Sequence, residues 1–112
     1  MDYKNKTVWI TGASSGIGKE LAIQFAALGA NVILSARSVD KLNELKQSLH
    51  GDGHIIVPLD LSAPEAVLAQ VTDLLDTLPA IDILINNGGV SQRSLFLENE
   101  FNVYRQLMEV NY

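Results

Sequence analysis

The fold of this chain is decided by the stretch Thr11-Gly12-Ala13-Ser14-Ser15-Gly16-Ile17-Gly18, which follows the short apolar segment Val8-Trp9-Ile10 and precedes a helical apolar pattern. A glycine-rich turn at a helix start leaves backbone N–H groups unpartnered at the positive end of the helix dipole, where an anion such as phosphate is stabilised. We expect Gly12 to take angles closed to other residues, Gly16 to admit a pyrophosphate and Gly18 to let the helix pack tightly. Ser14 and Ser15 add hydroxyl groups. An ordinary glycine turn without a ligand is the alternative, which the flanking strand and helix disfavour.

Strand and helix patterns alternate along the rest of the chain. We expect strands at residues 8–11, 31–35, 54–59 and 81–85. Helices are expected between the glycine turn and Gly29, over 38–49, over 62–78, and from about 100 to the end. The first two helices carry apolar residues at helical spacing, which we expect to be buried: Ile17, Leu21, Phe25 and Leu28 in the first, and Val39, Leu42, Leu45 and Leu49 in the second.

Four strand–helix units with uniformly apolar strands predict an α/β fold with a parallel sheet covered on both faces. Right-handed crossovers give a Rossmann-type, doubly wound sheet with strand order 3-2-1-4 and a ligand site at the carboxyl ends of the strands. All 112 residues are expected to form one such domain.

The composition of the chain disfavours several classes of function. The net charge of −5 disfavours a nucleic-acid partner, which would need a basic face. No apolar run approaches the length of a membrane span, and the absence of cysteine excludes disulfides, cysteine nucleophiles and thiolate metal sites. A cytoplasmic location fits this composition. His50 and His54 flank a turn without a third ligand at suitable spacing, which disfavours a metal site.

The Gly-x-x-x-Gly-x-Gly spacing of the turn resembles the first signature of the short-chain dehydrogenases/reductases. Asn86-Asn87-Gly88-Gly89 resembles a second signature of that family, which usually has alanine where Gly88 stands. The longer segment 86–95 is similar to the family branch that includes dehydrogenase/reductase member seven. The resemblance implies an NAD(P)-binding oxidoreductase whose full-length members are about twice as long as this chain.

Arg37 decides which cofactor is expected. It follows the second strand, where family members that bind NAD usually place an acidic residue on the ribose hydroxyls, but the run Ser35-Ala36-Arg37-Ser38 has no carboxylate. A guanidinium can pair with the 2′-phosphate of NADP(H), which Ser14 or Ser15 would share. The alternative is a solvated arginine at a helix start.

The resemblance implies further site residues. Asp60 would accept from the adenine amino group, and Leu61 would line the adenine pocket. Asn111 would be a catalytic residue that completes a proton relay through a bound water. The alternatives are a turn aspartate that bonds its own backbone and a polar residue in a final helical turn. The full cofactor-binding set is Gly12, Ser14, Ser15, Gly16, Ile17, Gly18, Arg37, Asp60, Leu61, Asn87, Gly88 and Gly89.

The family's proton donor is a tyrosine with a lysine four residues later, and this chain lacks the pair. Tyr3, Tyr104 and Tyr112 are its three tyrosines, and none has a lysine at that distance. The chain also stops inside a helical pattern. We therefore expect the nucleotide-binding half of a longer enzyme; a small domain that ends in a helix is the alternative.

Three functions remain open. The first is an NADP(H)-dependent oxidoreductase that, at full length, transfers hydride between nicotinamide and a small-molecule carbonyl or secondary alcohol. The second is a non-catalytic NADP(H)-binding module. The third is a fragment that pairs with a copy of itself through an unpaired fourth strand, consistent with an expected homo-oligomer.

Overall fold

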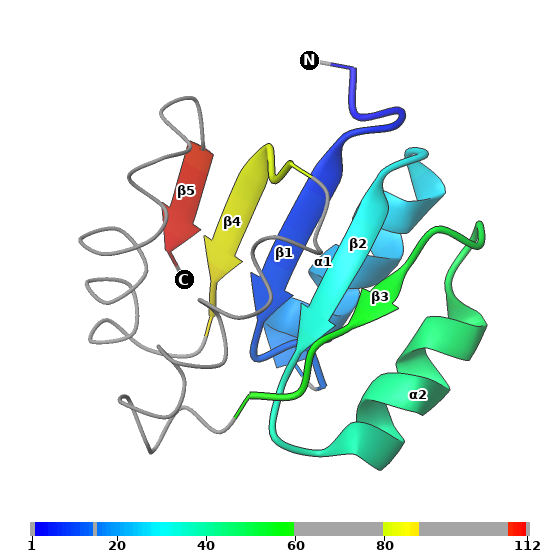
Figure 1. Cartoon of the computed structure of the whole chain (residues 1–112), viewed down its shortest axis with the longest axis vertical. Helices are drawn as coiled ribbons and strands as arrows, with labels where there is room; N and C mark the ends of the chain where they lie inside the picture. Colours follow the sequence, from blue (N-terminus) through cyan, green and yellow to red (C-terminus); the bar gives the residue numbers. More distant parts are fainter. Residues whose placement is uncertain (1, 15, 60–79, 88–107, 112) are drawn as a thin grey trace.

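The computed structural model describes residues 2–14, 16–59, 80–87 and 108–111. Its elements are β1 (Thr7–Thr11), α1 (Gly16–Ala27), β2 (Asn31–Ser35), α2 (Val39–Ser48), β3 (Ile55–Ile56), β4 (Ile83–Asn86) and β5 (Met108–Asn111) (Figure 1). The strands form one sheet in the order β3-β2-β1-β4-β5, and every neighbouring pair is parallel. The expected α/β fold and the order 3-2-1-4 are confirmed, with β5 added beside β4.

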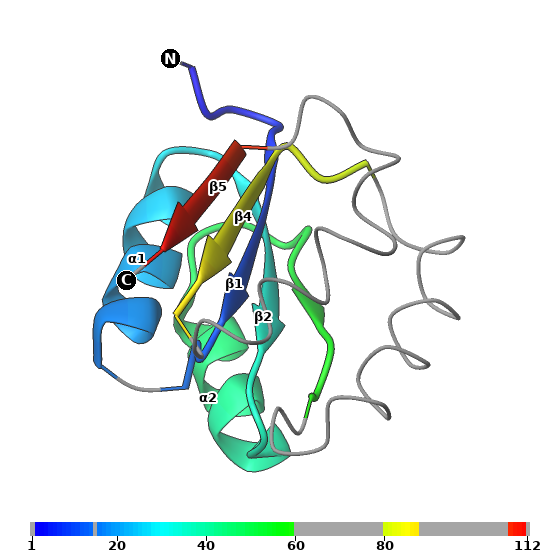
Figure 2. The ribbon, with the colours of Figure 1, turned by 90° about the vertical axis from the view of Figure 1, so that its left-hand side faces the viewer.

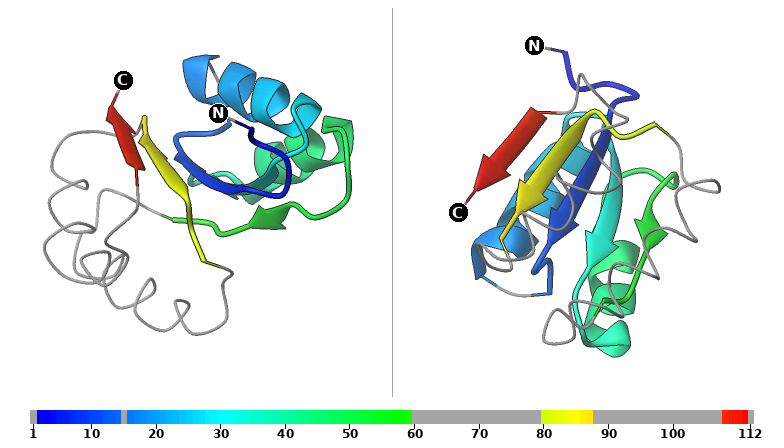
Figure 3. Two further views of the ribbon diagram at one scale, coloured as in Figure 1. Left: turned by 90° about the horizontal axis from the view of Figure 1, so that it is seen from above. Right: turned by 60° about the vertical axis from the view of Figure 1, so that its left-hand side comes forward.

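Helices α1 and α2 cover the same face of the sheet (Figures 2 and 3). The core between helices and sheet is built from alternate strand residues and small or branched helix residues: Val8, Ile10, Val32, Leu34, Ile83, Ile85, Ala22, Ala26, Leu42 and Leu45. Burial of this apolar area is the main term that holds the helices on the strands.

The opposite face of the sheet is apolar as well. Trp9, Ile33 and Leu84 are in register across three strands, and all are buried. The Trp9 indole N–H donates to the Ser35 Oγ atom over 2.8 Å, which gives this buried polar group a partner. Burial on both faces explains why the strands are uniformly apolar rather than alternating.

The buried face of α1 differs from the expected one. Its buried residues are Gly18, Ala22 and Ala26, whereas Ile17 and Leu28 are 55% and 56% exposed. Leu21 and Phe25, which complete the expected stripe, are partly buried beside this small-residue face. Small residues let the helix axis approach the sheet closely, so the larger side chains are displaced to the flanks.

The expected end of the first helix at Gly29 is confirmed. Gly29 has a positive φ of 91°, and its N–H donates to the Ala26 carbonyl oxygen over 3.0 Å. The Ala30 N–H donates to the Phe25 carbonyl oxygen over 3.1 Å. Together these bonds satisfy two of the last carbonyl groups of α1, as in many glycine-terminated helices.

Helix α2 begins after Ser38, whose side chain accepts from the Lys41 N–H. Leu42, Leu45 and Leu49 are buried as expected, but Val39 is 45% exposed. Val39 is the first residue of the helix, one turn before the stretch that packs on the sheet. The prediction was therefore wrong for this residue.

The helix expected from about residue 100 to the end is wrong over Met108–Asn111, which form β5. This strand pairs with β4 from Ile83↔Met108 to Asn86↔Asn111. The edge of β4 offers a row of backbone donors and acceptors, and parallel pairing satisfies them. The expected unpaired edge at the fourth strand is therefore also wrong.

The third strand is shorter than expected. Only Ile55–Ile56 form β3, although the Val57 and Leu59 N–H groups still donate to carbonyl oxygens of Leu34 and Ala36. The helix expected over 62–78 lies outside the described residues.

Candidate nucleotide-binding site

The carboxyl ends of four strands meet in one row. Thr11 is in register with both Ser35 and Asn86, and Asn86 is in register with Asn111. The glycine turn follows β1, Arg37 lies just beyond β2, and Asn87 follows β4. The parallel sheet thus brings segments far apart in the sequence to a single edge, where ligands of such sheets bind.

The glycine turn is built on close backbone contacts. Gly12 has a φ of 64°, and a Cβ atom there would lie 3.1 Å from both the Nδ2 and O atoms of Asn87. A Cβ atom at Gly18 would collide with the Gly12 carbonyl oxygen. The Ala13 N–H donates to the Ser35 carbonyl oxygen over 3.0 Å, which anchors the turn to β2. A side chain at Gly12 or Gly18 would therefore displace the turn.

Gly16 is different, because a Cβ atom there would meet no described atom within 4 Å, apart from its chain neighbours and the backbone of α1 itself. It has a φ of 59° and is the first residue of α1. The first N–H groups of a helix have no partners within the helix. Gly16 thus leaves open space beside backbone donors, a cradle that a side chain would fill and that fits a pyrophosphate.

Asn87 connects the end of β4 to the glycine turn. Its backbone N–H donates to Thr11 Oγ1 over 3.0 Å, and its side-chain Nδ2 donates to the Gly12 carbonyl oxygen over 3.2 Å. Thr11 Oγ1 in turn lies 3.5 Å from the Ile85 carbonyl oxygen, to which it donates. These bonds hold the turn and the ends of β1 and β4 in one arrangement.

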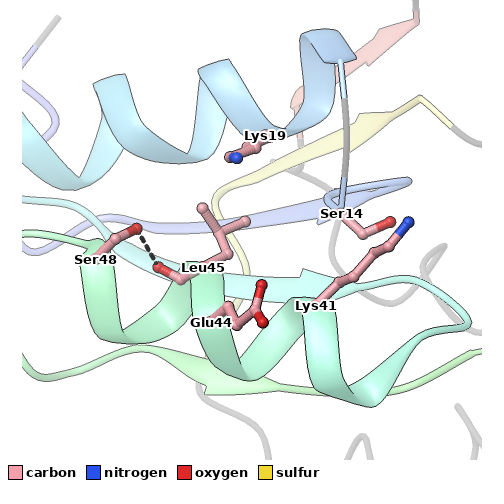
Figure 4. Close-up of a pocket in the computed structure, with 6 residues that line it drawn as sticks. All are labelled: Ser14, Lys19, Lys41, Glu44, Leu45 and Ser48. Atoms are coloured by element: carbon pink, nitrogen blue, oxygen red, sulfur yellow. Dashed lines mark hydrogen bonds between the residues drawn. The ribbon is translucent and has the colours of Figure 1, made fainter.

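A cavity of about 300 Å³ lies between α1 and α2 next to the glycine turn (Figure 4). It is lined by Ser14, Lys19, Lys41, Glu44, Leu45 and Ser48. Ser14 was an expected site residue, whereas the sequence analysis did not identify the two lysines. They lie on different helices, so no local pattern could have brought them together. Arg37 is exposed just before α2.

Several expected site residues lie outside the described residues: Ser15, Asp60, Leu61, Gly88 and Gly89. Tyr104 and Tyr112 lie outside them as well. Asn111 is placed by its backbone at the carboxyl end of β5, opposite Asn86. Ile17 is exposed in the first turn of α1.

His54 is buried at the opposite end of the sheet, and both ring nitrogens have partners. Its Nδ1 atom accepts from the Val32 N–H over 3.1 Å, and its Nε2 lies 2.7 Å from the His50 carbonyl oxygen, to which it donates.

Among the described residues, no three His, Cys, Asp or Glu side chains gather as a metal site requires. Neither α1 nor α2, the helices of the described part, has the length and hydropathy needed to cross a membrane.

Comparison with known proteins identifies the family. Residues 6–112 match the family model described as short chain dehydrogenase. The chain belongs to the short-chain dehydrogenase family. It is 45% identical over 117 residues to the human dehydrogenase/reductase SDR family member 7, covering 99% of this chain and 34% of that protein. The resemblance of segment 86–95 to that branch is thereby supported along nearly the whole chain.

Two solved structures share the fold of this short-chain dehydrogenase. A metagenomic short-chain oxidoreductase in complex with NADP superposes with a TM-score of 0.84 at 25% identity, over 99% of this chain and 63% of that one. L-Sorbose reductase from Gluconobacter frateurii, complexed with NADPH and L-sorbose, gives a TM-score of 0.65 at 38% identity, over 80% and 36%. The chain spans about a third of the length of the curated relatives it matches.

Proposed function

We propose that this chain binds NADP(H) and supplies the nucleotide-binding part of an oxidoreductase that acts on a small-molecule carbonyl or secondary alcohol. The observation that carries the proposal is the single edge at which the open Gly16 turn and Arg37 follow neighbouring strands. The NADP and NADPH complexes of the two solved relatives support the choice of cofactor.

Each part of this edge has a proposed role. The turn and the first N–H groups of α1 would hold the pyrophosphate, with Gly16 leaving the space. Arg37 and Ser14 would bind the 2′-phosphate, since the residues that follow β2 include no carboxylate before Asp40. Asp60 and Leu61 would hold the adenine, and Gly88 and Gly89 would let the backbone approach the nicotinamide ribose. The bound nicotinamide supplies hydride transfer.

Reduction of a substrate carbonyl needs a proton donor in addition to these cofactor-binding residues. Asn111 is proposed to hold a water of the proton relay from its place at the end of β5. Within this sequence, neither Tyr3 nor Tyr104 has a lysine four residues later, the pairing that would support proton donation. We therefore expect this chain to bind cofactor without reducing a carbonyl. A non-catalytic NADP(H)-binding module is the second candidate, and a Tyr-x-x-x-Lys in a longer natural chain would decide against it. Homo-oligomerisation and a cytoplasmic location stay predictions.

Arg37→Asp tests the cofactor assignment. We expect the parent chain to bind NADPH about ten- to a hundredfold more tightly than NADH, because a charge-assisted bond contributes about 1.5–3 kcal/mol. The variant should lose or reverse this preference, as measured by titration of both cofactors followed by fluorescence. Arg37→Gln, which removes the charge without adding a carboxylate, should fall between the two. A ratio of dissociation constants that stays the same in all three proteins would overturn the assignment.

A further inference from the structure

The cavity between α1 and α2 is continuous with the glycine turn, because Ser14 forms part of its wall. Figure 4 shows the Lys41 side chain extending from the first turn of α2 toward the Ser14 hydroxyl. Lys41 is four residues after Arg37, and Ser38 between them begins the helix. The cavity therefore lies beside the point at which β2 leads into α2.

The charged side chains that line the cavity are not bonded to one another. The hydrogen bond among its lining residues joins the Ser48 hydroxyl to the Leu45 carbonyl oxygen over 2.7 Å, and none joins Lys41 to Glu44 (Figure 4). Lys19 adds a second ammonium group from α1. The cavity thus presents two cations and a hydroxyl to a ligand, opposed by one carboxylate.

We propose that this cavity receives the 2′-phosphate of NADP(H), and that Lys41 is a second cation, beside Arg37, that determines the preference for NADP(H) over NAD(H). Glu44 opposes this preference, because its carboxylate shares the cavity and repels the phosphate. Both effects rest on the proposed function. They vanish for NAD(H), which carries a hydroxyl group in place of the phosphate.

Charge-removing variants of opposite sign test the proposal. At low ionic strength Lys41→Gln should weaken NADPH binding about three- to tenfold, and Glu44→Gln should tighten it about twofold, as expected for charges a few ångströms from a partly solvated phosphate. NADH binding should stay the same in both. Lys41→Arg, which keeps the charge, should retain the NADPH preference, and circular dichroism of each variant verifies the fold.

Lys46→Gln is the matched control, because Lys46 is exposed in the last turn of the same helix and does not line the cavity. Equal weakening by Lys46→Gln and Lys41→Gln would show an effect of net charge alone and would overturn the proposal. An unchanged NADPH affinity in Lys41→Gln, with the preference still lost in Arg37→Asp, would overturn the role of Lys41 and leave the proposed function standing. Failure of the parent chain to bind NADPH would overturn both.

Discussion

Side chains bond backbone groups at both ends of the sheet, but the two ends differ in how much of the chain they leave open. At the amino end, side chains take up backbone donors: Asp82 Oδ2 accepts from the Thr7 N–H over 2.9 Å, and His54 Nδ1 accepts from the Val32 N–H over 3.1 Å. At the carboxyl end, a Cβ atom at Gly16 would meet no described atom within 4 Å outside its own helix and chain neighbours, and Arg37 is exposed. In the described part of the chain, the amino end is bonded within the protein, and the carboxyl end offers the space in which we propose that NADP(H) binds.

This difference follows from the direction of the strands. Parallel pairing collects every segment that follows a strand at the carboxyl end, where α1 also begins. The connections into the strands meet at the amino end and are bonded among themselves: the Asn5 N–H donates to the Gly29 carbonyl oxygen, and the Asn31 N–H to that of Lys6. Asp82 and His54, which bond the backbone at that end, therefore contribute to stability.

Replacement of one glycine by valine at each end of the sheet should give the largest difference between the two ends. Gly16 and Gly51 both have positive φ, at 59° and 92°, and a valine at either position carries a strain of about 1–2 kcal/mol or more. We expect Gly16→Val to weaken NADPH binding more than about a hundredfold, or about 2.7 kcal/mol, because the new side chain fills the space beside α1.

Gly51→Val should leave NADPH affinity unchanged, since its Cβ would lie at the far end of the sheet, in ordinary contact with His54 Nε2 at 3.5 Å. Cofactor titration, with circular dichroism to verify helix content, measures both. If the Gly16 variant binds NADPH as tightly as the parent, the phosphate turn is not where we place it.

His54→Ala probes the closed end and should lower the free energy of unfolding by about 2–3 kcal/mol, because it leaves a cavity and an unsatisfied Val32 N–H. His54→Asn, which keeps an acceptor near the Nδ1 position, should recover part of this loss. Urea denaturation gives the stabilities, and NADPH affinity of the folded variants should not change. Weaker NADPH binding by folded His54→Ala would mean that the two ends are coupled.

Asn87→Ala should produce the smallest effect at the open end. Loss of the bond from Nδ2 to the Gly12 carbonyl oxygen should reduce the free energy of unfolding by about 1 kcal/mol. The turn would loosen, so NADPH and NADH should both bind more weakly, by the same factor. Urea denaturation measures the change in stability, and titration with NADPH and with NADH measures the change in binding. A change for NADPH alone would instead place Asn87 at the 2′-phosphate.

Features set by local chemistry could be predicted from the sequence. The glycine pattern predicts the turn and the positive φ value at Gly12, and Gly29 predicts the end of α1. Predictions failed where a residue's surroundings come from elsewhere in the chain. Apolar spacing in α1 favoured burial of Ile17 and Leu28, yet the close approach of Gly18 to Gly12 buries Ala22 and Ala26 instead.

The sequence by itself determined the parallel order of the strands and the edge at which a ligand would bind, because alternating strand and helix patterns permit few connections. Only the tertiary structure decided that Met108–Asn111 pair with β4, that His54 bonds β2, and that Lys41 and Ser14 share a cavity. Each of these depends on the distance between segments that are remote in the chain. Local patterns do not record that distance, because it is set by the packing of the whole sheet and its helices.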